Sequence, residues 1–401
     1  MFALHCKTLN STPSMPAPQI LFTPGPLMTS EGVRKAMMVD YASRDGTFLR
    51  AVKEIRRTLL DVAAVDHNEW AAILLQGAGT MGIEATINTL TPQVNGKYLL
   101  INTGKYSERQ RAIVKHLKRG LVEFTVGEGE EIDIAKLEEL LKAHPDITNV
   151  GYVFHETSTG MIYPAETIGA LVRRYLPNVV IIVDAISGFG GIPLRVPDAC
   201  DALITSSNKC FHGVPGFSVV LAKRSVVEAK KGNSTCLTMD LQRQLAGFDK
   251  NGQFVVTPPV HALMAFHQAL KEFQEEGGLE GRVRQYKQKA DIVVVAAKAM
   301  GFELFLHEYK PSFGNIVVAL KMPVHPLWNF KKFYTFLNER GFVIYPGKAS
   351  HAETFRFGII GATTAQNVRD VMEASREALA SMGITNLKDL PAPNSVDTSS
   401  S

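Results

Sequence analysis

Lys209 stands in the segment Ser206-Ser-Asn-Lys-Cys-Phe-His-Gly-Val-Pro-Gly216, a loop of small and polar residues between two apolar runs. A lysine attacks an aldehyde only in its neutral form, and a partly buried site near other cations lowers its pKa enough to permit this. Lys209 is therefore a candidate for a Schiff base with a carbonyl cofactor. An ordinary loop lysine is the more frequent occupant of such a segment, so the interpretation depends on its partners.

Asp184 ends the strongly apolar run Val179-Val-Ile-Ile-Val183. A carboxylate at the end of a buried strand is costly to desolvate unless a cation meets it. The protonated ring nitrogen of pyridoxal phosphate (PLP) is such a cation, and PLP enzymes place an Asp opposite it to keep the ring an electron sink. An Asp that caps the following turn is an equally good interpretation of this residue alone.

The segment Gly77-Ala-Gly-Thr-Met-Gly82 follows a predicted strand and opens a predicted helix. Backbone N–H groups at a helix N-terminus bind phosphate, and Ala78, Gly79 and Thr80 would supply them. A dinucleotide site also requires an acid about 20 residues further on. The first acid after the next strand is Glu108, so NAD is the weaker alternative, and a purely structural glycine-rich turn also remains open.

The three signals together are more specific than any one of them. In chain order they supply a phosphate site, a carboxylate partner for a pyridinium nitrogen and an amine for a Schiff base. All three are expected at successive strand ends of one sheet. Hydrolase and metalloprotease interpretations lose support, because the chain has no GxSxG turn and His155-Glu156 lacks the second histidine of HExxH. We expect no metal site.

The elements that must position these residues alternate between β-rich runs and helical patterns over the first two-thirds of the chain. This alternation predicts an α/β fold, with a mostly parallel sheet flanked by helices that binds ligands at the carboxyl ends of its strands. The expected strands are residues 72–76, 97–102, 150–154, 179–183, 202–205 and 217–222, and helices are expected at 104–117 and 134–142.

A long helical stretch at residues 261–276, followed by Gly277-Gly278, precedes a second region. We expect a large cofactor-binding domain over residues 19–280 and a smaller α+β domain over 281–388. The expected elements of the second region are strands at 315–319, 342–345 and 354–358 and helices at 330–340 and 365–382. Residues 1–18 and 389–401 are expected to be disordered extensions, the second because it is polar and rich in Pro and Ser.

The chain has 401 residues, 45% of them hydrophobic, which suffices for two domains. The 43 basic and 39 acidic residues form no long basic run, and no apolar run approaches the roughly 20 residues of a membrane span, so we expect neither nucleic-acid nor membrane binding. Four scattered cysteines without a CxxC pair fit a reducing compartment and predict a cytoplasmic protein. A Ser- and Thr-rich N-terminus with no acid before Glu31 leaves mitochondrial import as an alternative.

From about residue 19 to residue 382 the chain resembles the fold-type I, class V family of PLP-dependent aminotransferases. Within that family it is most similar to the 2-aminoethylphosphonate–pyruvate transaminase branch. The segments that point to this branch are Asn208-Lys-Cys and Gly341-Phe-Val-Ile-Tyr-Pro-Gly-Lys. The matching segments are Leu21-Phe-Thr-Pro-Gly-Pro-Leu, Leu74-Leu-Gln-Gly-Ala-Gly-Thr, His155-Glu-Thr-Ser-Thr-Gly-Met, Val183-Asp-Ala-Ile-Ser-Gly-Phe-Gly-Gly-Ile-Pro, Asn208-Lys-Cys-Phe-His-Gly-Val-Pro-Gly-Phe and Gly341-Phe-Val-Ile-Tyr-Pro-Gly-Lys.

The resemblance implies a ping-pong transamination. 2-Aminoethylphosphonate would give its amine to PLP and leave as phosphonoacetaldehyde, and pyruvate would take the amine and leave as L-alanine. Lys209 would form the Schiff base and then carry the proton. The implied cofactor contacts are Asp184 at the ring nitrogen, Tyr106 over the ring, Thr157 at the ring hydroxyl, and Ala78, Gly79, Thr80 and Asn208 at the phosphate.

The resemblance also implies a homodimer with shared active sites, because Thr257 matches a residue that reaches the phosphate of the partner subunit. Arg356 matches the arginine that binds the anionic end of the substrate, a task that suits a guanidinium fork. Two departures concern the cofactor and the substrate. Ala78 replaces a frequent Ser and loses one hydrogen bond, and residues 40–48 differ from the version typical of bacterial members. Within that segment, Arg44 is a candidate second cation for a dianionic phosphonate.

Three alternatives remain beside this function. The first is a sibling aminotransferase that acts on alanine, serine or glyoxylate. The second is a cysteine-desulfurase-like lyase, which would need a reactive cysteine in the smaller domain, whereas no cysteine follows Cys236. The third is a nucleotide-binding protein without catalytic activity, built on residues 77–82.

Overall fold

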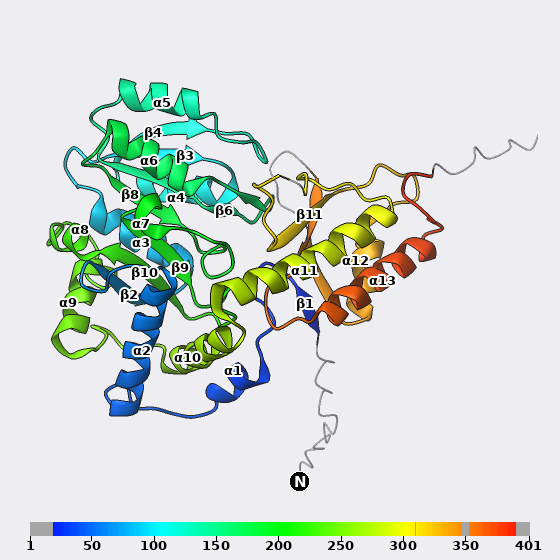
Figure 1. The fold of residues 1–401 in the computed structure, drawn as a ribbon, viewed down its shortest axis with the longest axis horizontal. Coiled ribbons are helices and arrows are strands. Elements are labelled where there is room, and N and C mark those ends of the chain that lie inside the picture. Colours follow the sequence, from blue (N-terminus) through cyan, green and yellow to red (C-terminus); the bar gives the residue numbers. More distant parts are fainter. Residues whose placement is uncertain (1–18, 309, 347–352, 390–401) are drawn as a thin grey trace, which may run out of the picture.

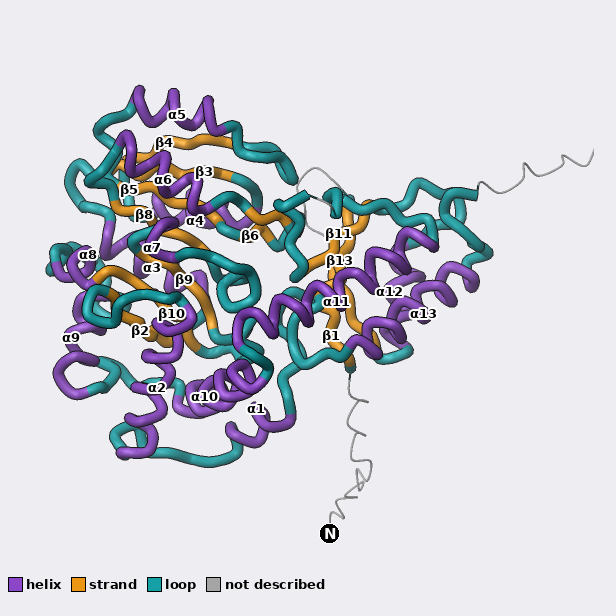
Figure 2. Tube along the Cα trace, in the orientation of Figure 1, coloured by secondary structure: helices purple, strands orange, loops and turns teal. Residues whose placement is uncertain are grey.

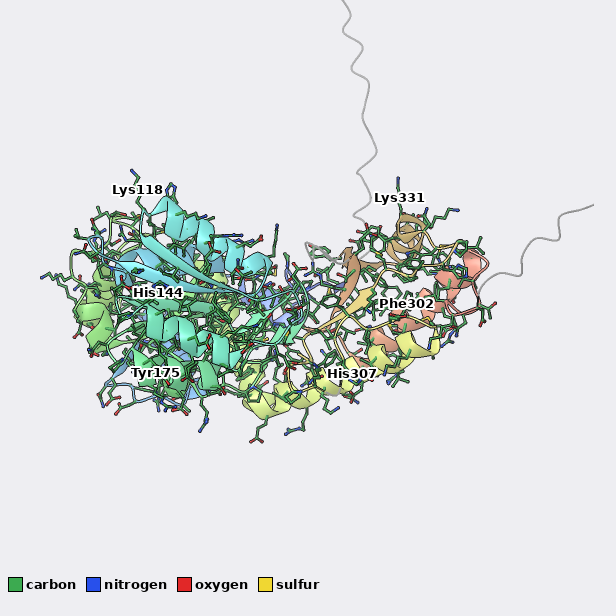
Figure 3. All side chains as sticks on the ribbon, turned by 90° about the horizontal axis from the view of Figure 1, so that it is seen from above. Lys118, His144, Tyr175, Phe302, His307 and Lys331 are labelled. Atoms are coloured by element: carbon green, nitrogen blue, oxygen red, sulfur yellow. The ribbon has the colours of Figure 1, made fainter. Side chains whose placement is uncertain are left out.

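The computed structural model describes residues 19–308, 310–346 and 353–389. It consists of two lobes that the long helix α11 (Gly278–Ala299) joins (Figure 1). Figure 3 shows the lobes from a second direction, with Tyr175 in the larger lobe and Phe302 in the smaller one. Within the described residues, no helix combines the length and the apolar character that crossing a membrane requires.

The larger lobe is built on a seven-stranded sheet of order β2-β10-β9-β8-β5-β3-β4. Only β10 runs against its neighbours. Helices flank the sheet (Figure 2), so the expected mostly parallel sheet flanked by helices is confirmed. The strands span Trp70–Gln76 (β2), Lys97–Asn102 (β3), Gly120–Thr125 (β4), Asn149–Val153 (β5), Val180–Asp184 (β8), Ala202–Ser206 (β9) and Phe217–Lys223 (β10). The sequence did not indicate β4, an edge strand whose side chains are only partly buried.

The helices of the larger lobe come before, between and after these strands in the chain. Strands β6 (His155–Glu156) and β7 (Met161–Ile162) form a separate two-stranded antiparallel sheet. The helices span Glu31–Ala36 (α1), Gly46–Val62 (α2), Gly79–Leu90 (α3), Lys105–His116 (α4), Ile134–Ala143 (α5), Ala165–Tyr175 (α6), Val196–Ala199 (α7), Arg224–Glu228 (α8), Leu241–Asn251 (α9) and Val260–Glu275 (α10).

The smaller lobe has a four-stranded sheet of order β1-β12-β13-β11 and its own hydrophobic core. The strands span Ile20–Phe22 (β1), Val317–Lys321 (β11), Phe342–Pro346 (β12) and Thr354–Gly358 (β13). Helices α11, α12 (Phe330–Glu339) and α13 (Ala365–Ser381) contribute to this core.

The division into two lobes differs from the expected one at two places. We expected residues 19–280 in the large domain, but β1 pairs in parallel with β12 and Phe22 packs in the smaller core. The expected boundary after residue 280 falls inside α11, where Tyr286 packs in the larger core and Ala290 in the smaller one. Of the expected extensions at residues 1–18 and 389–401, all residues but Asp389 lie outside the described residues.

The N-terminal segment carries the chain from the smaller lobe to the larger one. It leaves β1 through Thr23 and Pro24 and crosses the end of β13 at Gly358, where a Cβ atom would lie 2.4 Å from the carbonyl carbon of Thr23. The absence of a side chain at this glycine therefore permits the crossing. Beyond it, the Pro24 carbonyl accepts a hydrogen bond from Lys209 Nζ at 2.6 Å.

Replacing Gly358 with Ala is expected to lower the free energy of unfolding by about 1–3 kcal/mol, since the added methyl group meets backbone that cannot move independently. Urea denaturation followed by circular dichroism measures the change. Gly46→Ala is the matched control, because the nearest atom there is the end of the flexible Arg50 side chain, at 3.3 Å. Equal stability of the two variants would contradict the role of Gly358.

Candidate active site

A cavity of about 200 Å³ lies at the carboxyl ends of the strands of the larger sheet. It brings together residues from turns that are far apart in the sequence. The predicted residues that line it are Ala78, Gly79, Thr80, Tyr106, Thr157, Asp184, Asn208 and Lys209. The structure thus assembles these residues around one space, and their roles toward a cofactor stay predictions.

Parallel pairing of β8 with β9 explains why Asp184 and Lys209 meet. Asp184 is the last residue of β8 and lies opposite Ile204 of β9, and the chain then leaves β9 at Ser206 for the loop that carries Lys209. Because both strands point the same way, their polar continuations emerge at the same edge of the sheet. The Asn208 side chain accepts a hydrogen bond from Ser206 Oγ at 3.1 Å within this loop.

Lys209 is partly exposed to the cavity, yet protein atoms surround its amine. Burial lowers its pKa to about 8, with a further decrease from Arg356 and Arg109, while the Cys210 and Asp184 groups oppose the change. At this pKa about a tenth of the amine is neutral at pH 7. A Cβ atom at Gly25 would lie 2.5 Å from Nζ, so the Pro24-Gly25 backbone passes directly over the amine.

Asp184 is 4% exposed, and burial raises the pKa of its carboxyl to about 6. Its Oδ1 atom accepts a hydrogen bond from the Ile186 amide at 3.0 Å. Among the described residues no cation forms an ion pair with this carboxylate. A buried anion of this kind is stabilised by a cationic N–H group in the cavity, which is the property that the ring nitrogen of PLP would supply.

The anion-binding side of the cavity is the start of α3. Ala78 is the extended N-cap residue and makes no side-chain hydrogen bond to the helix, in keeping with the hydrogen bond that its replacement of Ser was expected to lose. The N-cap side chain therefore does not compete with a bound anion for the first-turn amides of α3. Thr80 Oγ1 accepts a hydrogen bond from Arg109 Nη1 at 2.8 Å.

Arg109 is a cavity residue that the sequence analysis missed. It lies on α4 close to Tyr106, with its guanidinium 5.2 Å from the centre of the Tyr106 ring. One signal was available, because Arg109 follows Tyr106 by three residues and side chains at that spacing share a helix face. The pair places an aromatic ring and a cation next to Thr80.

His155 and Glu156 were also missed as site residues, although the string that contains them was recognised. His155 lines the cavity, contacts Ser187 Oγ through Nδ1 at 2.9 Å, and has no hydrogen-bond partner for its buried Nε2. Burial lowers its pKa to about 3, so the ring is neutral at physiological pH. Glu156 accepts a hydrogen bond from the Tyr106 amide at 3.3 Å, and burial raises its pKa to about 7.

The remaining predicted residues divide between two places. Arg356 on β13 is 7% exposed and is not among the lining residues of the cavity, but it donates a hydrogen bond at 2.6 Å to the carbonyl of Thr157, which does line it. The smaller lobe thus places a guanidinium next to the cavity wall. Arg44 and Thr257 do not line the cavity. They lie together in a separate surface pocket of about 290 Å³.

Comparison with known proteins identifies the family. The model of the family described as aminotransferase class-V matches residues 35–371. The chain is 39% identical over 371 residues to 2-aminoethylphosphonate–pyruvate transaminase of Pseudomonas aeruginosa (strain UCBPP-PA14), covering 92% of this chain and 98% of that one. It is 37% identical over 359 residues to the bifunctional phosphonoacetaldehyde hydrolase/aminoethylphosphonate transaminase of Clostridioides difficile (strain 630), covering 88% of this chain and 56% of that longer protein.

Among solved structures, alanine–glyoxylate aminotransferase from Nostoc sp. has the same fold, with a TM-score of 0.82 at 22% identity over 94% of this chain and 100% of that one. At this identity the likeness concerns the fold alone. The sequence match extends through both lobes and includes the strand ends that form the cavity. The chain therefore belongs to the class-V aminotransferase family.

Proposed function

We propose that this protein is a PLP-dependent aminotransferase that transfers the amino group of 2-aminoethylphosphonate to pyruvate and yields phosphonoacetaldehyde and L-alanine. The observation that carries the proposal is the shared cavity of Lys209 and Asp184, with the N-terminus of α3 at its side. Relatives of 36–39% identity over about nine-tenths of the chain bear the name of this transaminase, which supports the choice of substrates.

The residues of the cavity fit the cofactor. Asp184 would hold the protonated ring nitrogen, Tyr106 would cover the ring and Thr157 would contact the ring hydroxyl. The first-turn amides of α3, with Thr80, Asn208 and Arg109, would hold the phosphate. When bound, PLP supplies an aldehyde carbon for the amine and a ring that withdraws electrons from it.

Lys209 would have two tasks. Its neutral fraction would bond to the aldehyde of the cofactor, and burial maintains that fraction near neutral pH. Once the substrate amine has replaced it, Nζ would accept the proton from the substrate carbon and return it to the neighbouring position. The Pro24 carbonyl, which now accepts from Nζ at 2.6 Å, would orient the amine for both tasks.

Arg356 would bind the anionic end of each substrate. Its guanidinium donates a hydrogen bond to the Thr157 carbonyl, and the planar geometry of a guanidinium matches the oxygens of a carboxylate or a phosphonate. Since Thr157 is itself a cavity residue, this contact fixes the position of the guanidinium relative to the cofactor site. His155, neutral and buried, would contribute an uncharged wall.

We further propose a homodimer in which Arg44 and Thr257 serve the site of the partner subunit. Both are exposed and lie outside the cavity of their own chain. Exposed apolar residues precede them in the sequence, Met38 at 83% and Val39 at 49% before Arg44, and Val256 at 37% before Thr257. Exposed apolar residues of this kind are expected at a subunit interface, which would cover them.

The cellular compartment that we propose is the cytoplasm. Cys200 and Cys210 are buried as free thiols, and Cys236 is a partly buried free thiol. Free thiols of this kind persist in a reducing environment, where disulfides are rare.

Lys209→Ala is expected to abolish alanine formation from 2-aminoethylphosphonate and pyruvate, and to remove the visible absorbance that a lysine-bound PLP gives. The physical reason is the loss of both the covalent attachment and the proton carrier. A coupled assay for L-alanine and an absorption spectrum measure the two effects. Glyoxylate and serine in the same assay test the sibling activities, and full activity of the variant would refute the proposed role of Lys209.

Asp184→Asn is expected to stabilise the PLP-free protein and to impair the loaded enzyme. The folded-state pKa of about 6 lies above the reference value of 3.8, so the cost of ionising Asp184 is absent below pH 3.8 and complete above pH 6. That cost is about 3 kcal/mol at 1.36 kcal/mol per pKa unit. Turnover should fall by roughly 100-fold or more, because an electrostatic stabiliser of the reacting system is lost.

Thermal unfolding of the PLP-free proteins measures the stability difference, which should be largest at pH 7.5 and about half as large at pH 5. Glu156 also titrates in this range, but it is present in both proteins and cancels in the comparison. A stability difference that does not change with pH would contradict the assigned burial cost.

Mixing two inactive variants tests the shared site. Chains that carry Lys209→Ala supply an intact Thr257, and chains that carry Arg44→Ala with Thr257→Ala supply an intact Lys209. If the sites are shared, half of the randomly mixed dimers contain one complete site, so about a quarter of the wild-type activity should return after subunit exchange. Activity no greater than the sum of the two separate variants would exclude the shared arrangement.

A further inference from the structure

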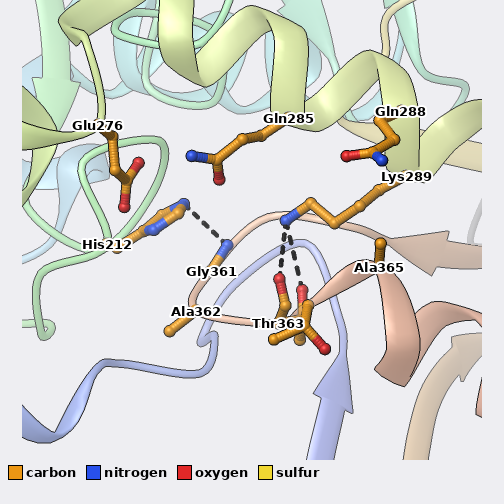
Figure 4. Close-up of a pocket in the computed structure, with 10 residues that line it drawn as sticks. His212, Glu276, Gln285, Gln288, Lys289, Gly361, Ala362, Thr363 and Ala365 are labelled. Atoms are coloured by element: carbon orange, nitrogen blue, oxygen red, sulfur yellow. Dashed lines mark hydrogen bonds between the residues drawn. The ribbon is translucent and has the colours of Figure 1, made fainter.

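A second pocket, of about 370 Å³, lies where the two lobes meet and is separate from the cofactor cavity (Figure 4). One wall is α11, which contributes Gln285, Gln288 and Lys289. The opposite wall is the turn at residues 361–365 that leads into α13, and His212 closes one end. Figure 4 shows the Lys289 amine reaching from the helix to Thr363.

Lys289 is 3% exposed, which is unusual for a lysine. Its Nζ donates to the Thr363 carbonyl at 3.2 Å and approaches the Thr363 hydroxyl at 3.5 Å, and both acceptors are uncharged. In the part of the chain that the structure describes, no ion pair joins Lys289 to an acidic side chain. Burial, followed by Arg282, lowers its pKa to about 8, as expected for an ammonium whose charge is not balanced.

The neighbouring groups provide only part of the missing negative charge, because Glu276 raises the pKa of Lys289 whereas burial and Arg282 lower it. Glu276 lines the pocket, but its Oε2 is paired with Arg282, at 2.7 Å to Nη2 and 2.9 Å to Nε. His212 is held neutral, because burial lowers its pKa well below the usual value and its Nε2 accepts the Gly361 amide at 2.9 Å. Lys289 is thus a buried cation beside an open pocket, an arrangement that costs free energy unless an anion enters.

The other pocket groups also favour an anion. Helix α13 begins at the pocket wall, with Thr364 as its N-cap, and 17 aligned peptide units direct the positive end of the helix dipole there. Gln285 and Gln288 carry amide donors on the opposite wall. Donors on two facing walls suit a tetrahedral oxyanion better than a planar carboxylate.

We propose that this pocket binds the phosphate or phosphonate group of a small molecule, with Lys289 as the anchoring cation. The pocket is larger than a single phosphate group, so it also has room for a short organic substituent. His212 follows Lys209 by three residues, and residues 361–365 belong to the smaller lobe. A bound oxyanion therefore connects the loop of the catalytic lysine with the smaller lobe. The proposal does not depend on which substrates the enzyme uses.

Isothermal titration with inorganic phosphate at constant ionic strength tests the site. Every protein in the titrations is loaded with PLP, which occupies the phosphate site of the cofactor, and carries Arg356→Ala, which removes the guanidinium proposed to bind the substrate anion. Lys289→Met is expected to weaken phosphate binding at least tenfold. Lys287→Met is the matched control, because Lys287 lies on the same helix, is 63% exposed and pairs with Asp291. It should bind phosphate as the wild type does. Unchanged phosphate affinity in Lys289→Met would overturn the proposal.

Gln288→Glu keeps the test decisive even if Lys289→Met folds poorly. Gln288 is exposed, so the substitution is compatible with the fold, and it places a carboxylate in the pocket that contains Lys289. This variant should lose phosphate binding and should melt at a higher temperature than the wild type when phosphate is absent. Wild-type phosphate affinity in Gln288→Glu would also overturn the proposal.

Two further titrations define the ligand class. Methylphosphonate should compete with phosphate, because it presents the same tetrahedral oxyanion with an organic substituent. Acetate should compete at least tenfold more weakly. Equal competition by acetate would overturn the assignment to phosphate-type ligands.

Discussion

Desolvation of two opposite charges at one sheet edge is the constraint on which the candidate site depends. Burial moves the pKa of Lys209 down to about 8 and that of Asp184 up to about 6, so each group shifts toward its neutral form. The two side chains form no ion pair with each other, and each faces the same cavity. The fold therefore holds an activated amine and an unbalanced carboxylate apart, in the arrangement that an electrophilic, cationic ring would complete.

The smaller lobe is part of this arrangement. Strand β1 leads directly to Pro24 and Gly25 above the Lys209 amine, and strand β13 presents Arg356 to the Thr157 carbonyl. Both strands belong to the four-stranded sheet, so one rigid element positions the backbone over the lysine and the guanidinium at the cavity wall. A site composed from two lobes in this way couples the geometry of substrate binding to the packing between them.

The junction of the lobes is polar and unevenly charged. Arg282 and Glu276 balance each other there, whereas Lys289 has only neutral acceptors. The same charge logic that points to a cationic partner for Asp184 thus points to an anionic partner for Lys289. In both cases a buried charge adjoins an open pocket, and the sign of the charge indicates the ligand.

The sequence by itself determined most strands of the larger sheet and the choice of the candidate site residues. Apolar runs that end in Asp184 or lead toward Lys209 are local patterns, and the parallel sheet that they predict brings strand ends to one edge. Tertiary structure alone decided the partner of β1, the contact of Lys209 with a carbonyl 185 positions away, and the separation of Arg44 and Thr257 from the cavity. Such contacts join segments that are distant in the chain, so no local pattern of apolar residues encodes them. The burial that shifts each pKa likewise depends on how the two lobes pack against each other.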